Sequence, residues 1–328
     1  MAPLTLSTHI EQWALKSTFR ISGYSWSSYG VNVVQISDGT HVGHAESTPV
    51  HFLNETTESA QSQIEAVAQS FECGTDRERL HELMPPGSAR NAVDCALWDL
   101  EAKRCGKRIW ELVGIDPRPL ATAFTIGIED SPEAMAGRAR EAAAFSILKI
   151  KLDKDRPVER VSAIRAARPE ARLTVDANQA WTFDELREFA PRLADLGVRL
   201  IEQPLPRGAD AELEEYKSPI PLCADESCQH RGHLGIAADR YQIINIKLDK
   251  AGGLTEALLL AKAIRRKDRE VLVSCMGGTS LGMAPGFVVA QLADYVELDG
   301  HTLLRSDRFP QLRYENGKLA VLDCRLWG

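Results

Sequence analysis

The chain has 328 residues, of which 44% are hydrophobic and 26% are charged, and its formal net charge is −7. These values are those of a folded globular protein, and the negative balance argues against a large basic surface for DNA or RNA. The length allows one large domain and one smaller domain. We therefore expect a small-molecule substrate and no nucleic-acid partner.

The cysteines and the first residues bear on the compartment. The seven cysteines are scattered, odd in number and without the paired spacing of a zinc site: Cys73, Cys95, Cys105, Cys223, Cys228, Cys275 and Cys324. The first 16 residues lack the basic region and apolar run of a signal peptide, and no stretch approaches the roughly 18 apolar residues of a membrane span. We expect free thiols in a cytoplasmic protein with no membrane partner, and a homo-oligomer is compatible with the sequence.

Residues 1–115 predict an α+β capping domain. Strand-like stretches at 5–15 and 31–37 precede helical stretches at 59–70 and 89–102. Between the strands, SGYSWSSYG at 22–30 is rich in Ser and Gly, and it predicts either a mobile lid or a long hairpin loop. We place this lid loop at about residues 20–30.

Residues 116–300 alternate short β-branched runs with amphipathic helical stretches, the pattern of parallel βαβ units. We expect eight strands, at 122–126, 148–152, 173–176, 199–202, 221–225, 242–247, 270–274 and 295–299, and helices at 157–169, 183–197 and 255–266. No glycine-rich phosphate turn follows the first strand, so an α/β fold with a (β/α)₈ TIM-type barrel is favoured over an open doubly wound sheet. Residues 301–328, with a turn at Asn316–Gly317, are expected to pack back on the capping domain.

Acidic residues end three adjacent strands of the expected barrel, where barrel enzymes place their active sites. Asp176, Glu202 and Asp225 would converge there, and oxygen ligands with room for a substrate suit Mg²⁺. A single acid at a strand end is equally well explained as a helix cap or as one partner of a surface ion pair. Three acids that each follow an apolar run are costly to bury without a metal or a partner, so we predict one Mg²⁺ per subunit.

Lysines flank this acidic arc. Lys149 and Lys151 end the second strand and, being two apart, face the same side, whereas Lys247 ends the sixth strand. Lysines on both sides of one carbon can remove a proton from one face and return it to the other, which inverts a stereocentre. Burial or a nearby cation lowers the pKa of a lysine and makes it a better base. The alternative is that Lys149 or Lys151 simply pairs with Asp153, and Lys247 with Asp249.

The motifs LKIKL, VDAN, IEQP, CADES and NIKLDKAGG, with RNAVDCALWDLEAK at 90–103, resemble the muconate lactonizing enzyme subgroup of the enolase superfamily along essentially the whole chain. The likeness is strongest to dipeptide epimerases, such as those acting on L-Ala-D/L-Glu in murein peptide metabolism. It implies an isomerase that inverts the α-carbon of the C-terminal residue of an L-Ala-Xaa dipeptide through a Mg²⁺-stabilised enolate. It also implies Mg²⁺ ligands at Asp176, Glu202 and Asp225, an acid/base pair at Lys151 and Lys247, and support from Lys149.

Two departures from the family concern specificity. Dipeptide epimerases hold the substrate ammonium with D-x-D after strand eight, where this chain has Glu297 and Asp299. Epimerases acting on Ala-Glu resemble one another in a lid arginine, which 22–30 lacks, although Arg20 lies just before it. We expect a second residue that is small, apolar or aromatic, not necessarily Glu. The substrate-binding residues predicted besides Glu297 and Asp299 are Tyr24, Trp26 and Asn178.

Other functions use the same residues. A muconate-type cycloisomerase or an o-succinylbenzoate-type syn-dehydratase would keep the lysines and the metal. Glu297 and Asp299 would repel a second substrate carboxylate, and they disfavour N-acyl amino acids, whose nitrogen carries no charge. A non-catalytic metal-binding barrel is the rival from another class, but it has no need of the full set of lysines and acids. The sequence does not determine which lysine serves which enantiomer.

Overall fold

The computed structural model describes residues 3–72, 74–315 and 317–328. Its N-terminal part holds an antiparallel sheet, ordered β1 (Thr5–Ile21), β2 (Tyr24–Ser37) and β3 (Val42–Ser47), and the short turn η1 (His51–Leu53). The helices there are α1 (Thr57–Glu72), α2 (Arg77–Leu83), α3 (Ser88–Cys105) and α4 (Ile109–Val113). Ile64, Val67 and Phe71 lie three or four residues apart on α1 and are buried, so this helix packs one apolar face inward.

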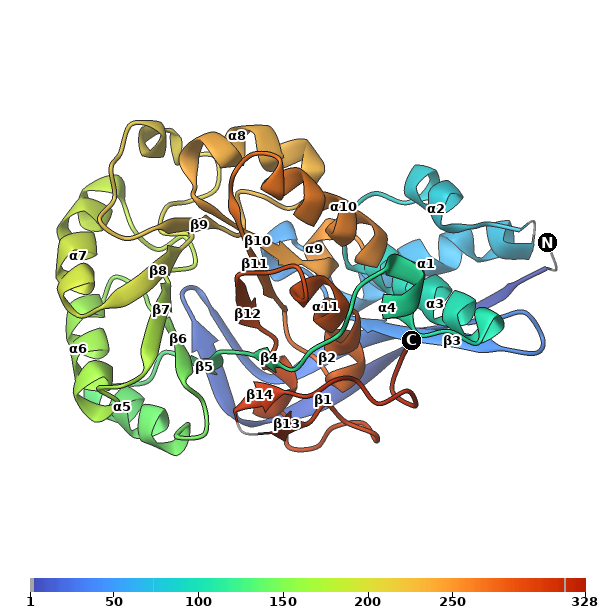
Figure 1. The fold of residues 1–328 in the computed structure, drawn as a ribbon, viewed down its shortest axis with the longest axis horizontal. Coiled ribbons are helices and arrows are strands. Elements are labelled where there is room, and N and C mark those ends of the chain that lie inside the picture. The colour runs from blue at the N-terminus through green and yellow to red at the C-terminus, as the bar shows by residue number, and fades with distance from the viewer. Residues whose placement is uncertain (1–2, 73, 316) are drawn as a thin grey trace.

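The segment expected to be a loop at 22–30 is mostly strand. Ile21 pairs with Tyr24 across a turn at Ser22 and Gly23, and the glycine has a φ of +76°, which costs it little. Aromatic residues such as Tyr24 and Trp26 favour the strand that follows. The resulting β1–β2 hairpin extends from the N-terminal part to the barrel strands β5 and β6 (Figure 1).

Eight parallel strands form the barrel, as predicted. They are β5 (Phe124–Ile126), β6 (Ile147–Lys151), β7 (Arg172–Asp176), β8 (Val198–Glu202), β9 (Leu222–Ala224), β10 (Ile243–Lys247), β11 (Glu270–Ser274) and β12 (Tyr295–Glu297), hydrogen-bonded in this order. A hydrogen bond of 3.0 Å from Ala123 N to Val296 O links the two ends of the sheet. The (β/α)₈ fold class is therefore confirmed.

Helices surround the strands (Figure 1). They are α5 (Pro132–Glu141), α6 (Pro157–Ala167), α7 (Phe183–Asp195), α8 (Leu234–Arg240), α9 (Leu248–Ala251), α10 (Leu254–Arg265) and α11 (Ser280–Ala290), with the short turns η2 (Ala211–Glu214), η3 (Arg231–His233) and η4 (Gly300–Leu303). The expected helices at 157–169, 183–197 and 255–266 correspond to α6, α7 and α10. Each runs antiparallel to its strand, so strand C-termini gather at one rim.

The barrel interior is layered. Leu200, Cys223, Ile243 and Leu272 form an apolar floor. Because side chains two apart on a strand face the same side, the residues two positions further on also point inward, and they are polar. They include Glu202, Asp225 and Asn245, all 0% exposed. The fold thus places ionisable groups above a dry floor and beneath the rim.

The C-terminal residues contact the N-terminal helices. Trp327 is buried and donates from Nε1 to Cys95 O on α3 at 3.3 Å, and Ile109 N on α4 donates to Gly328 O at 3.1 Å. Strand β13 (Tyr314–Glu315) pairs with β14 (Lys318–Leu319), and β14 pairs with β4 (Leu120–Ala121). Asn316, half of the expected turn, and Cys73 lie outside the described residues. The division of the chain at residue 115 stays a prediction.

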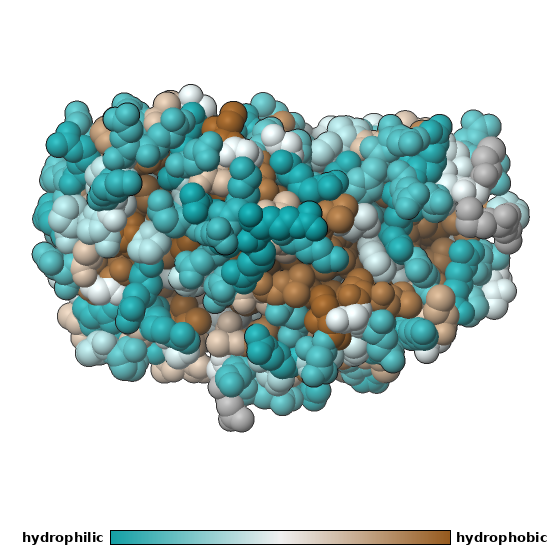
Figure 2. Space-filling model, turned by 45° about the horizontal axis from the view of Figure 1, so that its top comes forward, coloured by the Kyte–Doolittle hydropathy of each residue, from teal (hydrophilic) through white to brown (hydrophobic). Residues whose placement is uncertain are grey.

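The face in Figure 2 is mainly hydrophilic, with hydrophobic residues gathered toward its middle. Among the described helices, none has the length and apolar character needed to cross a membrane. The six described cysteines are free, as expected.

Candidate active site

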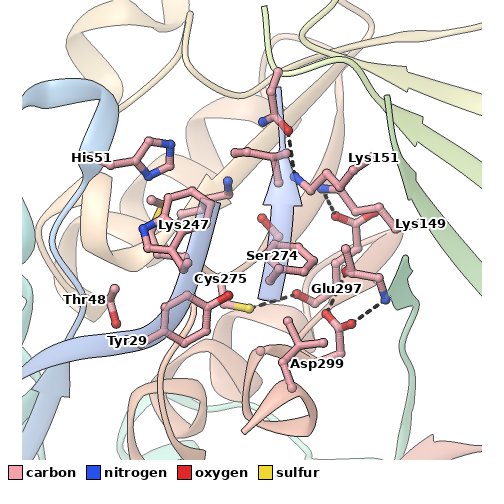
Figure 3. Close-up of a pocket in the computed structure, with 18 of the residues that line it drawn as sticks. Tyr29, Thr48, His51, Lys149, Lys151, Lys247, Ser274, Cys275, Glu297 and Asp299 are labelled. Atoms are coloured by element: carbon pink, nitrogen blue, oxygen red, sulfur yellow. Dashed lines mark hydrogen bonds and ion pairs between the residues drawn. The ribbon is translucent and has the colours of Figure 1, made fainter. Parts of the chain in front are cut away.

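The barrel rim and the N-terminal hairpin enclose a cavity of about 90 Å³ (Figure 3). The predicted site residues that line it are Lys149, Lys151, Asn178, Lys247, Glu297, Asp299 and Trp26. Asp176, Glu202 and Asp225 lie behind the lysines and are fully buried. Tyr24 is 43% exposed and lies outside the lining. The fold therefore brings together ten of the eleven predicted residues and leaves Tyr24 at the edge.

One flank of the cavity is built from β6 and β7. Lys151 and Asp176 are neighbours in register on these parallel strands, and Lys151 Nζ lies 2.6 Å from Asp176 Oδ2. Lys151 Nζ also donates to Asn178 Oδ1 at 3.0 Å. Asn178 has a φ of 43°, a left-handed conformation that asparagine tolerates better than most residues. Lys151 thus pairs with Asp176, and the alternative pairing with Asp153 is wrong.

The opposite flank is built from β9, β10 and the turn into α9. Lys247 Nζ lies 2.6 Å from Asp225 Oδ2. Asp249 instead accepts from Thr48 N at 3.0 Å and from Asn91 Nδ2 at 2.8 Å, so it does not pair with Lys247. Figure 3 shows Lys151 and Lys247 on opposite sides of the cavity. This is the placement that the strand order predicted.

The neighbouring carboxylates raise the pKa values of the buried lysines Lys149 and Lys247. Burial lowers the pKa of Lys247, but Asp225 and Glu202 raise it more, and the net direction is upward. The same balance holds the pKa of Lys149 well above its ordinary value, with Glu202 as its strongest acidic neighbour. At these two lysines the carboxylates outweigh the lowering by burial that the sequence predicts. The reason is that each ammonium has a buried carboxylate in direct contact.

The acidic centre holds two more carboxyl groups than lysines. Six buried carboxylates, Asp176, Glu202, Asp225, Glu226, Glu297 and Asp299, meet four buried lysines, Lys149, Lys151, Lys247 and Lys250. Burial and Asp225 raise the pKa of Glu226 to about 7, and its buried Oε2 has no hydrogen-bond partner. Burial and Asp176 likewise raise the pKa of Glu202. Acids respond in this way when they are crowded without enough counter-charge.

This centre fits a divalent cation by charge and by donor type. Within the part of the chain that the structure describes, no group of three or more His, Cys, Asp and Glu side chains is arranged to hold a metal as it stands. Asp176 and Asp225 each contact a lysine at 2.6 Å. Their oxygens, with those of Glu202, come from three adjacent strand ends and are the hard donors that Mg²⁺ prefers. A double positive charge would balance the excess.

Glu297 is engaged by Lys149. Lys149 Nζ lies 2.6 Å from Glu297 Oε2, 2.5 Å from Glu202 Oε2 and 3.1 Å from Asp176 Oδ2. The longer arm of glutamate permits this reach across the barrel from β12. Part of the negative charge expected to receive a substrate ammonium is therefore already compensated.

Asp299 is held by the first barrel strand. Its Oδ2 accepts from Thr125 N at 2.6 Å and its Oδ1 from Thr125 Oγ1 at 3.1 Å. Burial raises the pKa of Asp299 to about 6, while the two hydrogen bonds from Thr125 act in the opposite direction. Asp299 therefore faces the cavity in a fixed orientation.

Aromatic residues of the N-terminal part cover the cavity. Phe19, Trp26 and Tyr29 come from the β1–β2 hairpin, and His51 comes from η1. The Trp26 and His51 rings are 5.0 Å apart, and Tyr24 packs edge-on to His51 at 4.2 Å. Burial, together with the positive charges of Lys247 and Lys151, lowers the pKa of His51 to about 4. The cover is thus uncharged at neutral pH.

Arg20 points away from this cavity. Its neighbours Phe19 and Ile21 line the cavity, so strand alternation turns the arginine outward. There Arg20 Nε donates to Ile128 O at 2.9 Å, and Arg20 Nη2 lies 2.7 Å from Asp130 Oδ1. Ile128 N returns a hydrogen bond to Arg20 O at 2.9 Å. Arg20 therefore fastens the hairpin to the barrel rim and does not face a substrate.

Several residues of the site were missed from the sequence. Tyr29, Thr48 and His51 belong to the N-terminal part, and no motif links them to the barrel. Asn245 could have been found, because it precedes Lys247 by two residues on β10 and so faces the same side. Its Nδ2 donates to Glu202 Oε1 at 2.7 Å, and it accepts from Ser274 Oγ at 2.9 Å.

A (β/α)₈ barrel with carboxylates on three adjacent strand ends and lysines on both sides defines an acid–base enzyme of the enolase type. Residues 133–325 match the model described as enolase C-terminal domain-like, and residues 4–114 match that of the mandelate racemase/muconate lactonizing enzyme N-terminal domain. The chain belongs to the mandelate racemase/muconate lactonizing enzyme family of the enolase superfamily.

Relatives cover nearly the whole chain. L-Ala-D/L-Glu epimerase of Escherichia coli (strain K12) is 41% identical over 318 residues, which are 96% of this chain and 99% of that protein. N-acetyl-D-glutamate racemase of a Pseudoalteromonas species is 41% identical over 298 residues, or 90% and 94% of the two chains. The family resemblance read from the motifs is confirmed.

Solved structures agree with these relatives. An enolase family member from Agrobacterium tumefaciens with homology to dipeptide epimerases, with bound sodium and L-Ala-L-Glu, is 43% identical with a TM-score of 0.96, covering 99% of this chain and 100% of that one. Dipeptide epimerases from other bacteria have been solved with Mg and a dipeptide.

Proposed function

We propose that this protein is a dipeptide epimerase, an isomerase that inverts the α-carbon of the C-terminal residue of an L-Ala-Xaa dipeptide by moving a proton between two lysines. The observation that carries the proposal is the position of Lys151 and Lys247 on opposite sides of one buried cavity (Figure 3). A single base can return a proton only to the face from which it came. Two bases on opposite faces give inversion.

Each lysine has a defined part in this scheme. Lys151 or Lys247 takes the α-proton from one face, and the other, as an ammonium, supplies a proton to the opposite face. Lys149 places a positive charge beside the substrate carboxylate, where negative charge builds up as the proton leaves. Asp176, Glu202 and Asp225 would hold Mg²⁺, which when bound polarises the substrate carboxylate and makes the α-proton more acidic.

The substrate amine is assigned to Asp299. Thr125 fixes its carboxylate at the cavity wall, and an ammonium there would keep Asp299 ionised. Glu297 contributes less, because Lys149 already neutralises it. Asn178, which accepts from Lys151 and faces the mouth, completes the polar contacts.

The side chain of the second residue is assigned to the aromatic cover. Phe19, Trp26, Tyr29 and Phe52 line this part of the cavity, and among the described lining residues there is no arginine. Arg20 is occupied at the rim by Asp130. An apolar or aromatic side chain gains contact area there, whereas a carboxylate would be desolvated without a cationic partner. We therefore infer a preference for small, apolar or aromatic residues over Glu.

A second candidate function is racemisation of an N-acylated amino acid. The Lys149–Glu297 contact of 2.6 Å favours it, because one acid of the expected ammonium site is already neutralised and an uncharged acylamide can lie beside it. The two functions share the lysines and the metal. They differ only in the group recognised next to Asp299.

Exchange of the α-proton in D₂O tests both functions. The enzyme is incubated with Mg²⁺ and a library of L-Ala-L-Xaa dipeptides together with the matching N-acetyl amino acids, and mass spectrometry records a gain of one dalton. Gain in dipeptides alone supports the epimerase, and gain in the acetylated compounds alone supports the racemase. No gain in either set, with folded protein, would favour lactonizing or syn-dehydrating chemistry.

Three wider assignments accompany the proposal. We propose a role in murein peptide metabolism, because that process supplies Ala-containing dipeptides, and a cytoplasmic location, in keeping with the reduced cysteines. We also propose a homo-oligomer. Light scattering with the intact protein would contradict the last assignment by returning the mass of a single chain.

A further inference from the structure

Lys250 is a fourth buried lysine of the acidic centre, and the scheme above gives it no part. It is 1% exposed, and its Nζ donates at 2.7 Å both to Asp225 Oδ1 and to the Asp225 carbonyl oxygen. Lys247 holds the other carboxylate oxygen, Oδ2, at 2.6 Å. One aspartate therefore carries a lysine on each of its two oxygens.

The two lysines of this pair differ in access. Lys247 lines the cavity, whereas Lys250 does not belong to the lining. Lys250 lies on α9, a single turn whose four residues are all buried. The two lysines are three residues apart in the sequence but lie in different elements. Lys247 ends β10 and points into the barrel, whereas Lys250 lies in the helical turn that follows. Only Lys247 can reach a substrate.

Hydrogen bonds from Arg90 fix the turn that carries Lys250. Arg90 on α3 donates from Nε to Gly252 O at 3.0 Å and from Nη2 to Ala251 O at 2.8 Å. Gly252 has a φ of +83°, and a Cβ there would lie 2.5 Å from Arg90 Nε, so both conformation and space require glycine. These contacts hold the backbone of Lys250 in place independently of the substrate.

The opposite flank has a matching arrangement. Asp176 Oδ2 is shared by Lys151 at 2.6 Å and Lys149 at 3.1 Å. Each proposed acid/base lysine therefore contacts an aspartate that also contacts a second lysine. Lys149 divides its charge among three carboxylates, whereas the ion-pair partner of Lys250 is Asp225.

Lys250 gives Asp225 a cationic contact that takes no part in proton transfer. To reach an α-carbon, Lys247 must loosen its contact with Asp225. A fully buried carboxylate left without a counter-charge is strongly destabilised. Lys250 stays bound to Oδ1 and to the carbonyl oxygen, so it keeps the orientation of Asp225 fixed and adds to the counter-charge that Mg²⁺ would supply.

We propose that Lys250 is a positioning residue that holds Asp225 while Lys247 moves between this aspartate and the substrate. The inference rests on the proposed function, in which Lys247 transfers a proton at one face of the α-carbon. It predicts an effect confined to that face, because Lys151 and Asp176 lie on the other side of the cavity. A residue needed only for folding would affect both faces alike.

The test compares α-proton exchange of the two epimers, L-Ala-L-Xaa and L-Ala-D-Xaa, in D₂O with Mg²⁺. Lys247→Ala first identifies the epimer that Lys247 serves. In Lys250→Met, a neutral side chain of similar length, exchange of that epimer should fall about 10- to 100-fold relative to exchange of the other epimer. Lys262→Met, at an exposed position of α10, is the control and should leave the ratio of the two rates unchanged.

Two further variants and one physical measurement complete the design. Lys149→Met should move the ratio in the opposite direction, because Lys149 lies on the Lys151 flank. Lys250→Arg keeps a cation and should restore part of the lost rate. The rise in melting temperature on adding Mg²⁺ should persist in Lys250→Met, which shows that the metal site survives.

These measurements distinguish failure of the Lys250 proposal from failure of the proposed function. Equal loss for both epimers in a folded, Mg²⁺-binding variant would overturn the proposal, as would an unchanged ratio. Failure of both Lys250→Met and Lys250→Arg to fold would assign Lys250 to stability alone. Absence of exchange in the unmodified enzyme with every dipeptide and N-acetyl amino acid would instead refute the proposed function, and the role of Lys250 with it.

Discussion

The floor and the cover of the cavity are held together by different kinds of interaction. The floor of the cavity is formed by the polar groups at the strand ends, where buried charged groups lie in direct contact, as in the Lys151–Asp176 and Lys247–Asp225 pairs at 2.6 Å. On the cover, aromatic rings meet at centroid distances from 4.2 to 6.4 Å, and Tyr24 is partly exposed. A buried charge tolerates no loss of its partner, whereas packing contacts are individually weak. The floor therefore determines whether the reaction occurs, and the cover determines on which substrate.

The largest effect should come from removing either flanking lysine. Lys151→Ala and Lys247→Ala should each lower the rate of epimer interconversion by about 10²–10⁴-fold, because each removes a proton-transfer group. Each variant should lose exchange with a different epimer first. Circular dichroism of the substrate follows interconversion, and Lys262→Ala is the control. Equal loss of exchange for both epimers in both variants would contradict the two-base scheme.

Metal removal tests the floor without changing its residues. Chelation should abolish activity, and Mg²⁺ should restore it. Mg²⁺ at 100 times its Kd should raise the free energy of unfolding by about 2.7 kcal/mol, because it binds only the folded state. Asp225→Asn should lose this increment, and Asp184→Asn, whose side chain is 92% exposed, should keep it. Calorimetric unfolding with and without Mg²⁺ measures the difference, and an increment retained in Asp225→Asn would remove that residue from the metal site.

A charge placed in the cover should change selectivity but leave the chemistry intact. Trp26→Arg supplies a cation to the cavity, so turnover of L-Ala-L-Glu relative to L-Ala-L-Phe should rise about 10-fold or more. Ser27→Arg, at the exposed neighbouring position, should leave the ratio unchanged. Steady-state kinetics with both dipeptides provides the comparison. If the unmodified enzyme already prefers L-Ala-L-Glu strongly, the assignment of an apolar subsite is wrong.

The smallest effect is the pH response of the cover. The pKa of His51 is lowered to about 4 by burial and by Lys247 and Lys151, while Asp225 opposes the shift. The unfolded chain therefore takes up this proton first as pH falls, so stability is present above about pH 6.5 and lost toward pH 4. Denaturant unfolding at pH 7 and pH 4.5 should show about 1 kcal/mol less pH dependence in His51→Phe, since solvent reaches part of the ring.

The control for the pH response is Ser27→Ala, a substitution at an exposed position of the same hairpin that carries no titrating group. It should leave the pH dependence close to that of the unmodified protein. Equal slopes for the unmodified protein and His51→Phe would show that the ring gains its proton without cost in the folded state. The cover would then carry charge at moderately acidic pH.

The barrel and most of its floor follow from local rules in the sequence. Parallel strands alternate with helices, residues two apart share a side, and strand ends meet at one rim, so Asp176, Glu202 and Asp225 could be placed together without coordinates. Lys151 and Lys247 fall on opposite sides because three strands separate them. These inferences needed only the order of the strands.

Tertiary structure alone decided what the local rules leave open. The register of the β1–β2 hairpin turned Arg20 outward to Asp130 and placed Trp26 and Tyr29 over the cavity. Packing of α3 against α9 placed Lys250 beneath Asp225. In each case the contact joins segments far apart in sequence. Their relative positions depend on how whole elements pack, and no periodicity within either segment encodes that.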